Sequence, residues 1–272
     1  MTDATLPARS SRHHYAYDTF TTGLILGDLA FARTDPGPGD RVPAFDIELL
    51  DGGRLAGASL GPRPVLLVFG SLTCPVTESS GAVLRRLHAL FGDRIRFVMV
   101  NTREAHPGQH IPQPRTSAEK REHAFRLRAH HRFPFEVAVD GIDGAFHRAM
   151  SPKPNSAYLI RPDGVIAYRA HWANDEPALQ RAITGLLARG SAFRGRSRAM
   201  AGPLLRAIGH LPGIVRRGGS KVARDVWAAV PPFAVMALLT RPLAFLPADA
   251  RGPVALAVVT ILAVLAAYVM QA

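Results

Sequence analysis

The chain lacks a second cysteine, because Cys74 is the only one in its 272 residues. One cysteine excludes an internal disulfide, a Cys-x-x-Cys redox pair and any zinc site built from several cysteines. A secretory signal is also absent, since the start of the chain is polar and carries His13, His14 and Asp18 before any apolar run of useful length. Redox chemistry in this chain would therefore use one thiol and take a second thiol from another molecule.

Acidic residues are scarce in the C-terminal third of the chain. Residues 177–272 contain twelve Arg or Lys and only two acids, Asp225 and Asp249, so this part carries +10 of the formal net charge of +12. Such a basic segment is attracted to nucleic acid or to an anionic membrane surface. The residues that follow it decide between these two partners.

Two uncharged stretches, residues 226–240 and 253–270, end the chain. Pro231 and Pro232 interrupt the first, and the second has about the minimum length that spans a hydrocarbon core. Basic residues beside apolar helices favour membrane lipid over nucleic acid as the partner. We therefore expect membrane localisation through one or two spans, with the catalytic domain on the cytoplasmic side. Helices buried in a soluble oligomer, such as a homodimer, are the alternative.

Cys74 lies where an apolar strand turns into a helix. Residues 64–69 form a short apolar run bounded by Pro and Gly, which is typical of a strand buried on both faces. Pro75 suits the first position of a helix, and apolar residues recur with helical spacing up to Phe91. The free N–H groups and the dipole at a helix N-terminus favour a thiolate, so we predict a nucleophilic cysteine with a lowered pKa. A small buried structural cysteine is the alternative.

A second parallel strand is expected over residues 94–100, joined to the first through the Cys74 helix. Its carboxyl end should lie beside Cys74, because ligands of open α/β sheets bind where the strands end. Glu104 and His106 follow this strand and are candidates for a proton donor and its orienting partner, although a polar surface loop would look the same. The prolines within residues 107–112 prevent a helix that would pair His106 with a second histidine, so we expect no metal.

The rest of the domain alternates helices and strands. The predicted elements are a charged helix over residues 116–130, a short strand over 136–140, a hairpin over 156–169 and an amphipathic helix over 175–190. His123, His130 and His131 are expected to be solvated on the charged helix. Pro154, just before the hairpin, is a candidate for the cis proline that faces the nucleophile in thioredoxin-type folds.

The order strand, helix, strand, helix, short strand, hairpin, helix, with the thiol at the first strand-to-helix turn, is that of a thioredoxin-like domain. We therefore predict an α/β, three-layer thioredoxin-like domain over residues 41–190. The other predicted parts are a leader and linker over residues 1–40, a basic amphipathic linker over 191–225 and membrane-associated helices over 226–272.

Three short motifs in this domain resemble the iodothyronine deiodinase family. The active-site run of that family, Gly-Ser-x-Thr-selenocysteine-Pro, is matched by residues 70–75, with Cys74 in place of selenocysteine. Its Glu-Ala-His-Pro motif is matched by residues 104–107. A following Ile-Pro-Gln-His-Arg run is similar to residues 111–115, in which the second active-site histidine of the family falls on Pro114. The motifs occur in the same order in both.

The resemblance implies reductive dehalogenation of a small-molecule substrate. The Cys74 thiolate would attack the iodine of an iodinated aromatic, and His106 and Glu104 would help to protonate the ring carbon. An external thiol or a thioredoxin-type protein, rather than a cofactor, would then reduce the sulfenyl iodide. The other candidate site residues are Thr73 and Ser71, which can bond the thiolate, and Pro154 and Arg115, which are candidates for substrate contacts.

Two other functions stay open. A thiol peroxidase would oxidise Cys74 to a sulfenic acid, but the peroxiredoxin pattern Pro-x-x-x-Thr-x-x-Cys is absent, since its proline falls on Leu67 and its threonine on Ser71. A general thiol oxidoreductase or a non-catalytic thioredoxin-like binding module needs no iodinated substrate. The expected function is a membrane-anchored oxidoreductase with one nucleophilic cysteine.

Overall fold

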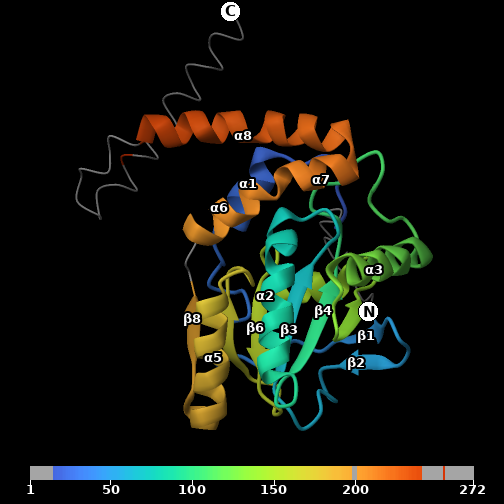
Figure 1. The fold of residues 1–272 in the computed structure, drawn as a ribbon. Helices are drawn as coiled ribbons and strands as arrows, with labels where there is room; N and C mark the ends of the chain where they lie inside the picture. The colour runs from blue at the N-terminus through green and yellow to red at the C-terminus, as the bar shows by residue number, and fades with distance from the viewer. Residues whose placement is uncertain (1–14, 198–200, 241–253, 255–272) are drawn as a thin grey trace, which may run out of the picture.

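An eight-stranded mixed sheet forms the centre of the computed structural model, which describes residues 15–197, residues 201–240 and residue 254 (Figure 1). Its strands are β1 (Asp46–Leu49), β2 (Arg54–Ala56), β3 (Val65–Gly70), β4 (Arg96–Asn101), β5 (Glu136–Val139), β6 (Ala157–Ile160), β7 (Ile166–Ala170) and β8 (Gly195–Ser197). They lie in the order β2-β1-β5-β4-β3-β6-β7-β8.

The strands in the middle of the sheet set the position of Cys74. β3 pairs in parallel with β4, with Val65 opposite Arg96 and Gly70 opposite Asn101, and β4 pairs in parallel with β5. Every residue of β3 is buried, as expected of a strand that is covered on both faces. The carboxyl ends of β3, β4 and β5 therefore meet at one edge of the sheet, and Cys74 follows directly at that edge.

Helices cover both faces of the sheet. The helices α2 (Pro75–Phe91), α3 (Ser117–His131) and α5 (Glu176–Arg189) pack on one face around the larger apolar core. The short α4 (Ala145–Met150) packs on the other face, where Phe45 stacks on Phe146. The predicted caps are present, because Thr116 and Glu119 bond reciprocally at the start of α3 and Asp175 accepts from the first turn of α5.

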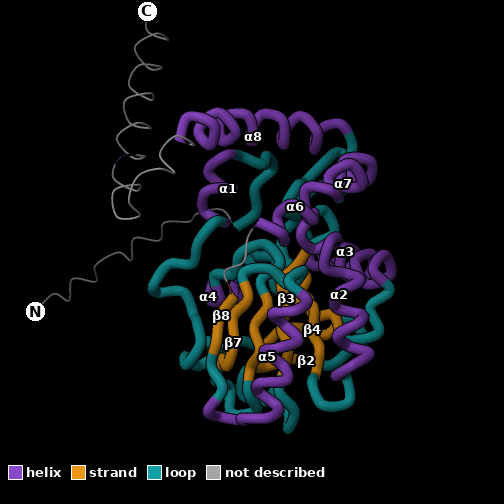
Figure 2. The backbone as a smooth tube through the Cα atoms, turned by 60° about the vertical axis from the view of Figure 1, so that its left-hand side comes forward, coloured by secondary structure: helices purple, strands orange, loops and turns teal. Residues whose placement is uncertain are grey.

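Four helices from the two ends of the described chain lie over the carboxyl end of the sheet (Figures 1 and 2). They are α1 (Thr22–Asp28), α6 (Ala201–Gly209), α7 (Leu211–Gly218) and α8 (Ser220–Thr240), and we call them the cover. The Thr22 hydroxyl donates a 2.8 Å hydrogen bond to the carbonyl of Ala229, which ties α1 to α8. The cover is thus built from segments about two hundred residues apart in sequence.

The observed element order from β3 to α5 confirms the predicted thioredoxin-like fold. Beyond the predicted domain, after the short 3₁₀ turn η1 (Gly190–Ala192), β8 extends the sheet parallel to β7 and was not predicted. In the described part of the chain, no helix has the length and apolar character needed to cross a membrane. Residues 226–240, the first predicted span, belong to α8, and residues 253–270, the second, lie outside the described residues apart from residue 254.

Candidate active site

Cys74 is the N-cap residue of α2. Its backbone is extended, and its Sγ accepts a 3.5 Å hydrogen bond from the N–H of Thr77, so the thiol takes the place that a capping hydroxyl usually occupies. Pro75 fills the first helical position, as predicted. The side chain is buried, with 3% of its surface exposed, and packs against Val76, Trp172 and Ala207.

Burial decides the protonation of this thiol. It raises the pKa of Cys74 above its usual range, and the hydrogen bond from Thr77 lowers it by less. The predicted lowering of the pKa is therefore wrong, because loss of hydration outweighs the helix N-terminus. A thiol with a raised pKa keeps its proton at pH 7, so Cys74 needs a base to become a nucleophile.

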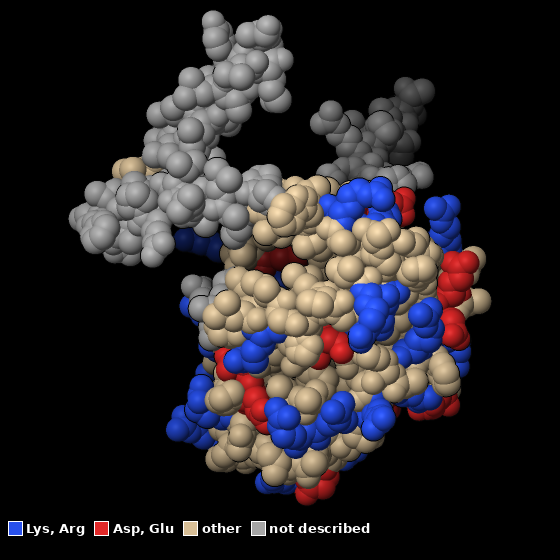
Figure 3. Space-filling view, turned by 45° about the horizontal axis from the view of Figure 1, so that its top comes forward, with Lys and Arg blue, Asp and Glu red and all other residues tan. Residues whose placement is uncertain are grey.

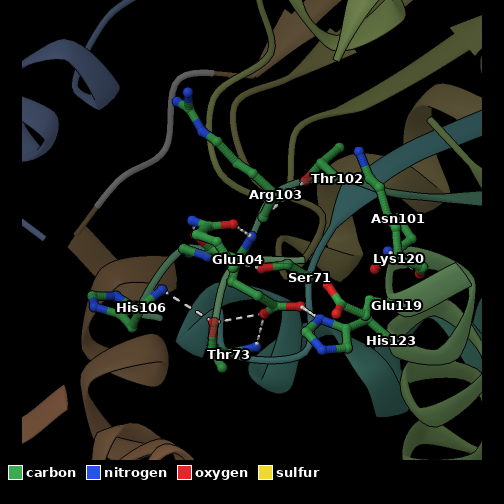
Figure 4. A network of polar contacts seen from close by, with 12 residues as sticks. Ser71, Thr73, Asn101, Thr102, Arg103, Glu104, His106, Glu119, Lys120 and His123 are labelled. Atoms are coloured by element: carbon green, nitrogen blue, oxygen red, sulfur yellow. Dashed lines mark hydrogen bonds and ion pairs between the residues drawn. The ribbon is translucent and has the colours of Figure 1, made fainter. Parts of the chain in front are cut away.

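Glu104 supports the turn that carries the thiol (Figure 4). This fully buried carboxylate accepts hydrogen bonds from the Thr73 N–H at 2.8 Å and the Thr73 hydroxyl at 2.7 Å, and its other oxygen lies 2.9 Å from Nδ1 of His123. His123 is thus a buried partner of Glu104, and the prediction that it is solvated is wrong because α3 turns this side chain inward. Glu104 holds the turn in place and lines neither of the cavities at Cys74.

The loop after β4 is bonded to the same turn. The N–H of Ala105 donates to the Ser71 hydroxyl at 3.1 Å, and the N–H of His106 donates to the Thr73 hydroxyl at 3.1 Å. The ring of His106 lies 4.1 Å from the ring of Phe20, centroid to centroid. Burial lowers the pKa of His106 to about 4, so the ring is neutral at pH 7 and carries no imidazolium proton.

Cys74 lines two cavities. One is polar, has a volume of about 40 Å³ and includes Ser71, Arg103 and Lys153 in its wall. The other is apolar and has a volume of about 250 Å³. The residues that line both are Tyr17, Asp28, Cys74, Ala105 and Pro154. The smaller cavity has room for a water molecule, and the larger one has room for part of an organic ligand.

Asp28 is a site residue that sequence analysis missed. It ends α1, and burial raises its pKa to about 6, with the cations Arg103 and Lys153 opposing this shift. Among the described residues that line either cavity, it is the one carboxylic acid. The negative charge of Asp28 also raises the pKa of Cys74, so the two groups are electrostatically coupled. Nothing in the polar N-terminal sequence marks Asp28, because its position depends on how α1 packs.

The walls of the apolar cavity contain two ring nitrogens without partners. Nδ1 of His106 and Nε1 of Trp172 are buried and have no hydrogen-bond partner among the described residues. Aromatic rings of Tyr17 and Phe20 complete this wall. A buried polar atom without a partner is unfavourable, so a ligand with an apolar body and one polar group would fit here.

Two predicted substrate contacts have different outcomes. Pro154 lines both cavities, but its peptide bond is trans, so the prediction of a cis proline is wrong. Arg115 is exposed and lines neither cavity. Gln113, two residues before Arg115, is a buried polar residue of that motif. Its side chain accepts a hydrogen bond from the N–H of Glu104, donates one to the carbonyl of Glu104 and donates one to the carbonyl of Tyr17 at 2.9 Å.

A cluster of charged and imidazole groups ties the cover to α2. Glu78 lies 2.9 Å from Nε2 of His130 and 2.5 Å from the guanidinium of Arg217 on α7, and Nε2 of His131 lies 3.9 Å away. His131 is buried, which corrects the prediction that it is solvated, and burial lowers its pKa to about 4. Glu78, His130 and His131 lie close enough together to bind a metal ion. Arg217 already forms an ion pair with the Glu78 carboxylate, so we interpret the cluster as an ion-pair network between α7 and α2.

The fold and the site together define a thioredoxin-like domain with one buried cysteine at the start of the helix that follows β3. No family model matches the chain, and no curated protein matches it. Among solved structures, the chain is similar to an uncharacterized conserved protein from Geobacillus kaustophilus, at 17% identity over 56% of this chain and 82% of the other, with a TM-score of 0.46.

Two proteins that are named for an activity are also similar in structure. One is a secreted disulfide oxidoreductase of Mycobacterium tuberculosis, at 21% identity over 45% of this chain and 79% of the other, with a TM-score of 0.36. The other is a thio-disulfide isomerase from Thermus thermophilus, at 16% identity over 56% of this chain and 96% of the other, with a TM-score of 0.43. The fold of this chain is defined by its own strand order and by the place of Cys74 at the end of β3.

Proposed function

We propose that the chain is a single-cysteine thiol oxidoreductase that reduces an apolar organic substrate and is regenerated by an external thiol. The observation that carries this proposal is the position of Cys74, which caps α2 and lines both a polar and an apolar cavity. An isolated structural cysteine would need neither cavity. Because the chain has no second cysteine, the oxidised sulfur is resolved by a thiol from another molecule.

Asp28 supplies the base that Cys74 needs. With a pKa of about 6, most Asp28 side chains are ionised at pH 7 and can accept the thiol proton. The thiolate then attacks the substrate, a sulfur–substrate bond forms, and the bond to the leaving atom breaks with its electron pair. Asp28 returns the proton to the leaving group. Arg103 and Lys153 in the polar cavity favour the negative charge that develops there.

Reduction of an organic hydroperoxide or of a mixed disulfide follows this scheme. With a hydroperoxide, the O–O bond breaks, Cys74 becomes a sulfenic acid and an alcohol leaves after protonation. With a mixed disulfide, the S–S bond breaks and one thiol leaves. After the hydroperoxide reaction, two equivalents of external thiol restore Cys74 and leave as a disulfide, with release of water. After the disulfide reaction, one external thiol restores Cys74 and leaves as a disulfide with the half of the substrate that Cys74 had held.

Reductive deiodination is the second candidate function. It is favoured by the aromatic wall of the apolar cavity and by the unpartnered nitrogens of His106 and Trp172, which a phenol hydroxyl and ring would match. Here the C–I bond breaks, an S–I bond forms on Cys74 and the ring carbon takes the proton. Two external thiols then release iodide and restore the thiol. Membrane attachment on the cytoplasmic side is a further part of this proposal, and the basic, apolar C-terminal sequence supports it.

The test compares the full chain with Cys74→Ser on three probes, each with excess dithiothreitol. The probes are an iodinated phenol, cumene hydroperoxide and a mixed disulfide of small thiols. We expect turnover of at least one probe and a loss of at least a hundredfold in the serine variant, because a hydroxyl cannot form the sulfenic acid, mixed disulfide or sulfenyl iodide on which these reactions depend. Iodide release, peroxide loss and thiol release identify which bond is broken.

The serine variant also measures the direct reaction of dithiothreitol with each probe. Equal rates for the two proteins on all three probes would contradict a catalytic role of Cys74. Circular dichroism is the control for folding, and the isosteric change from sulfur to oxygen is expected to leave the spectrum unchanged.

A further inference from the structure

Five large apolar side chains are exposed on two helices of the cover. They are Leu204, Leu205 and Ile208 on α6 and Trp227 and Val230 on α8, and we call them the apolar face. Leu205 is 70% exposed and Trp227 is 78% exposed, which is unusual for side chains of this size. Residues three or four apart share one side of a helix, so Leu205 adjoins Ile208 and Trp227 adjoins Val230.

The apolar face adjoins the apolar cavity. Leu204, Ile208 and Val230 belong to the face and also line the cavity that contains Cys74. Figure 3 shows this end of the molecule, where uncharged side chains gather around a hollow. A ligand that enters the cavity between α6 and α8 therefore passes over an apolar rim before it reaches the thiol.

Positive charge accompanies the apolar face. Arg206, Arg216 and Arg224 are exposed on α6, α7 and α8, and the one acid of residues 201–240, Asp225, is buried and paired with Lys221. Arg224 precedes Trp227 by three residues, so both lie on the same side of α8. A second copy of this chain would bring like charges together at such a face, whereas an anionic surface would be attracted to it.

We infer that the apolar face rests on an anionic lipid surface and that the cavity receives its substrate from the lipid. Trp and Leu are the side chains that enter the interfacial region of a bilayer, and exposed Arg side chains attract anionic headgroups. In this arrangement α6 and α8 lie in the interface, and the mouth of the cavity opens toward the acyl chains. The substrate half of the inference rests on the proposed function; the lipid half does not require it.

The first experiment measures binding of the full chain to vesicles of phosphatidylcholine with about one third phosphatidylglycerol, by sedimentation. We expect binding that weakens with added salt and is at least tenfold weaker on pure phosphatidylcholine. The double variant Leu205→Glu/Trp227→Glu should lower the binding to anionic vesicles at least tenfold. A matched control, Leu90→Glu/Phe125→Glu, changes exposed apolar residues of α2 and α3 and should bind like the unchanged chain.

Three results would overturn the inference. The unchanged chain could fail to sediment with anionic vesicles, or the Leu205→Glu/Trp227→Glu chain could sediment as well as the unchanged chain, which would assign attachment to residues 241–272. Light scattering could also show that the double variant separates a dimer, which would assign the face to a second copy. The control variant guards against a general effect of two added negative charges.

The second experiment tests delivery from the lipid without any need for turnover. Cys74 is labelled by N-dodecylmaleimide dissolved in the vesicles or by iodoacetamide in water. Leu205 and Trp227 do not line the cavity, so the double variant should react with iodoacetamide at the unchanged rate and with the lipid-dissolved reagent at least fivefold more slowly. An equal rate with the lipid-dissolved reagent would contradict delivery through the apolar rim, even if the proposed reduction reactions are observed.

Discussion

Cys74 and Asp28 have complementary charge states at neutral pH. Burial keeps the proton on the thiol, while a pKa of about 6 leaves the carboxyl mostly ionised. Both side chains line the same two cavities, so proton transfer between them has room for a bridging water. In the proposed mechanism the neutral His106 and the fully bonded Glu104 hold the site in place, and Asp28 accepts and returns the proton.

Asp28→Asn tests this division of roles through pH. In the unchanged chain, the rate of Cys74 alkylation should rise as the pH increases through about 6, because Asp28 loses its proton there and becomes a base. In the variant this rise should disappear, and the rate should increase only at alkaline pH, where the thiol itself ionises. Asp18→Asn, an exposed change in the same segment, is the matched control. A rise near pH 6 that persists in Asp28→Asn would exclude Asp28 as the base.

The same substitution should change stability in a pH-dependent direction. The folded-state pKa of Asp28 is raised above the unfolded value, so the native state binds the proton more tightly and loses stability as the pH rises toward and through about 6. Asparagine carries no charge, so Asp28→Asn should raise the free energy of unfolding at pH 7 by about 1–3 kcal/mol. Below about pH 4 Asp28 is itself neutral in both states, so the substitution should not raise the free energy of unfolding there. Urea unfolding at both pH values checks this.

At the scale of elements, the cover is held by a few polar ties and by apolar contacts. Arg217 on α7 bonds Glu78 on α2, and Asn174 bonds the carbonyl of Pro203 on α6 at 2.8 Å. These hydrogen bonds attach α6 and α7 to the domain. Access of a reagent to the buried thiol therefore depends on how firmly these helices are held.

Arg217→Ala removes one of these ties. We expect the free energy of unfolding to fall by about 1–2 kcal/mol, since the pair is mostly shielded from water, and Cys74 alkylation by iodoacetamide to become severalfold faster. Arg216→Ala, which changes the exposed neighbour, should leave both quantities unchanged. If Arg217→Ala destabilises the chain without changing the alkylation rate, α7 does not control access to the thiol.

The sequence was sufficient for the elements that carry Cys74, Glu104 and His106, because strand ends of a parallel sheet must meet at one edge. It was insufficient for Asp28, which reaches the thiol only through the contact between α1 and α8, over two hundred residues apart. The sequence also did not predict that His123 and His131 are buried. Most residues of α3 are charged or polar, so no apolar periodicity marks the side of the helix that faces the domain. The trans peptide bond of Pro154 is the usual state of an X-Pro bond, and the expectation of a cis bond came from analogy with thioredoxin-type folds alone.

For the whole molecule, the C-terminal helices shield the thiol of a domain that is otherwise complete. The sheet ends with β8 at Ser197, and Ala207, Ile214 and Val222 of the later helices are buried against the rest. If these helices shield Cys74, a chain without them should expose the thiol to reagents in water.

A chain that ends at Ser197 keeps every described strand and loses α6, α7 and α8. We expect Cys74 alkylation by iodoacetamide to become at least tenfold faster, because Ala207 and the apolar cavity wall no longer cover the thiol. Circular dichroism separates loss of the cover from loss of the fold. An unchanged alkylation rate in a folded, shortened chain would show that the C-terminal helices do not shield Cys74.

The bond between Thr22 and Ala229 also has a consequence for synthesis on the ribosome. Cys74 emerges early, but Ala207 and the rest of its C-terminal shelter are translated more than a hundred residues later. At about 5–20 residues per second, the nascent chain carries an unsheltered thiol for roughly seven to thirty seconds. During that interval Cys74 has the reactivity of an open site, and any oxidant or chaperone that meets the growing chain meets the thiol before its cavity exists.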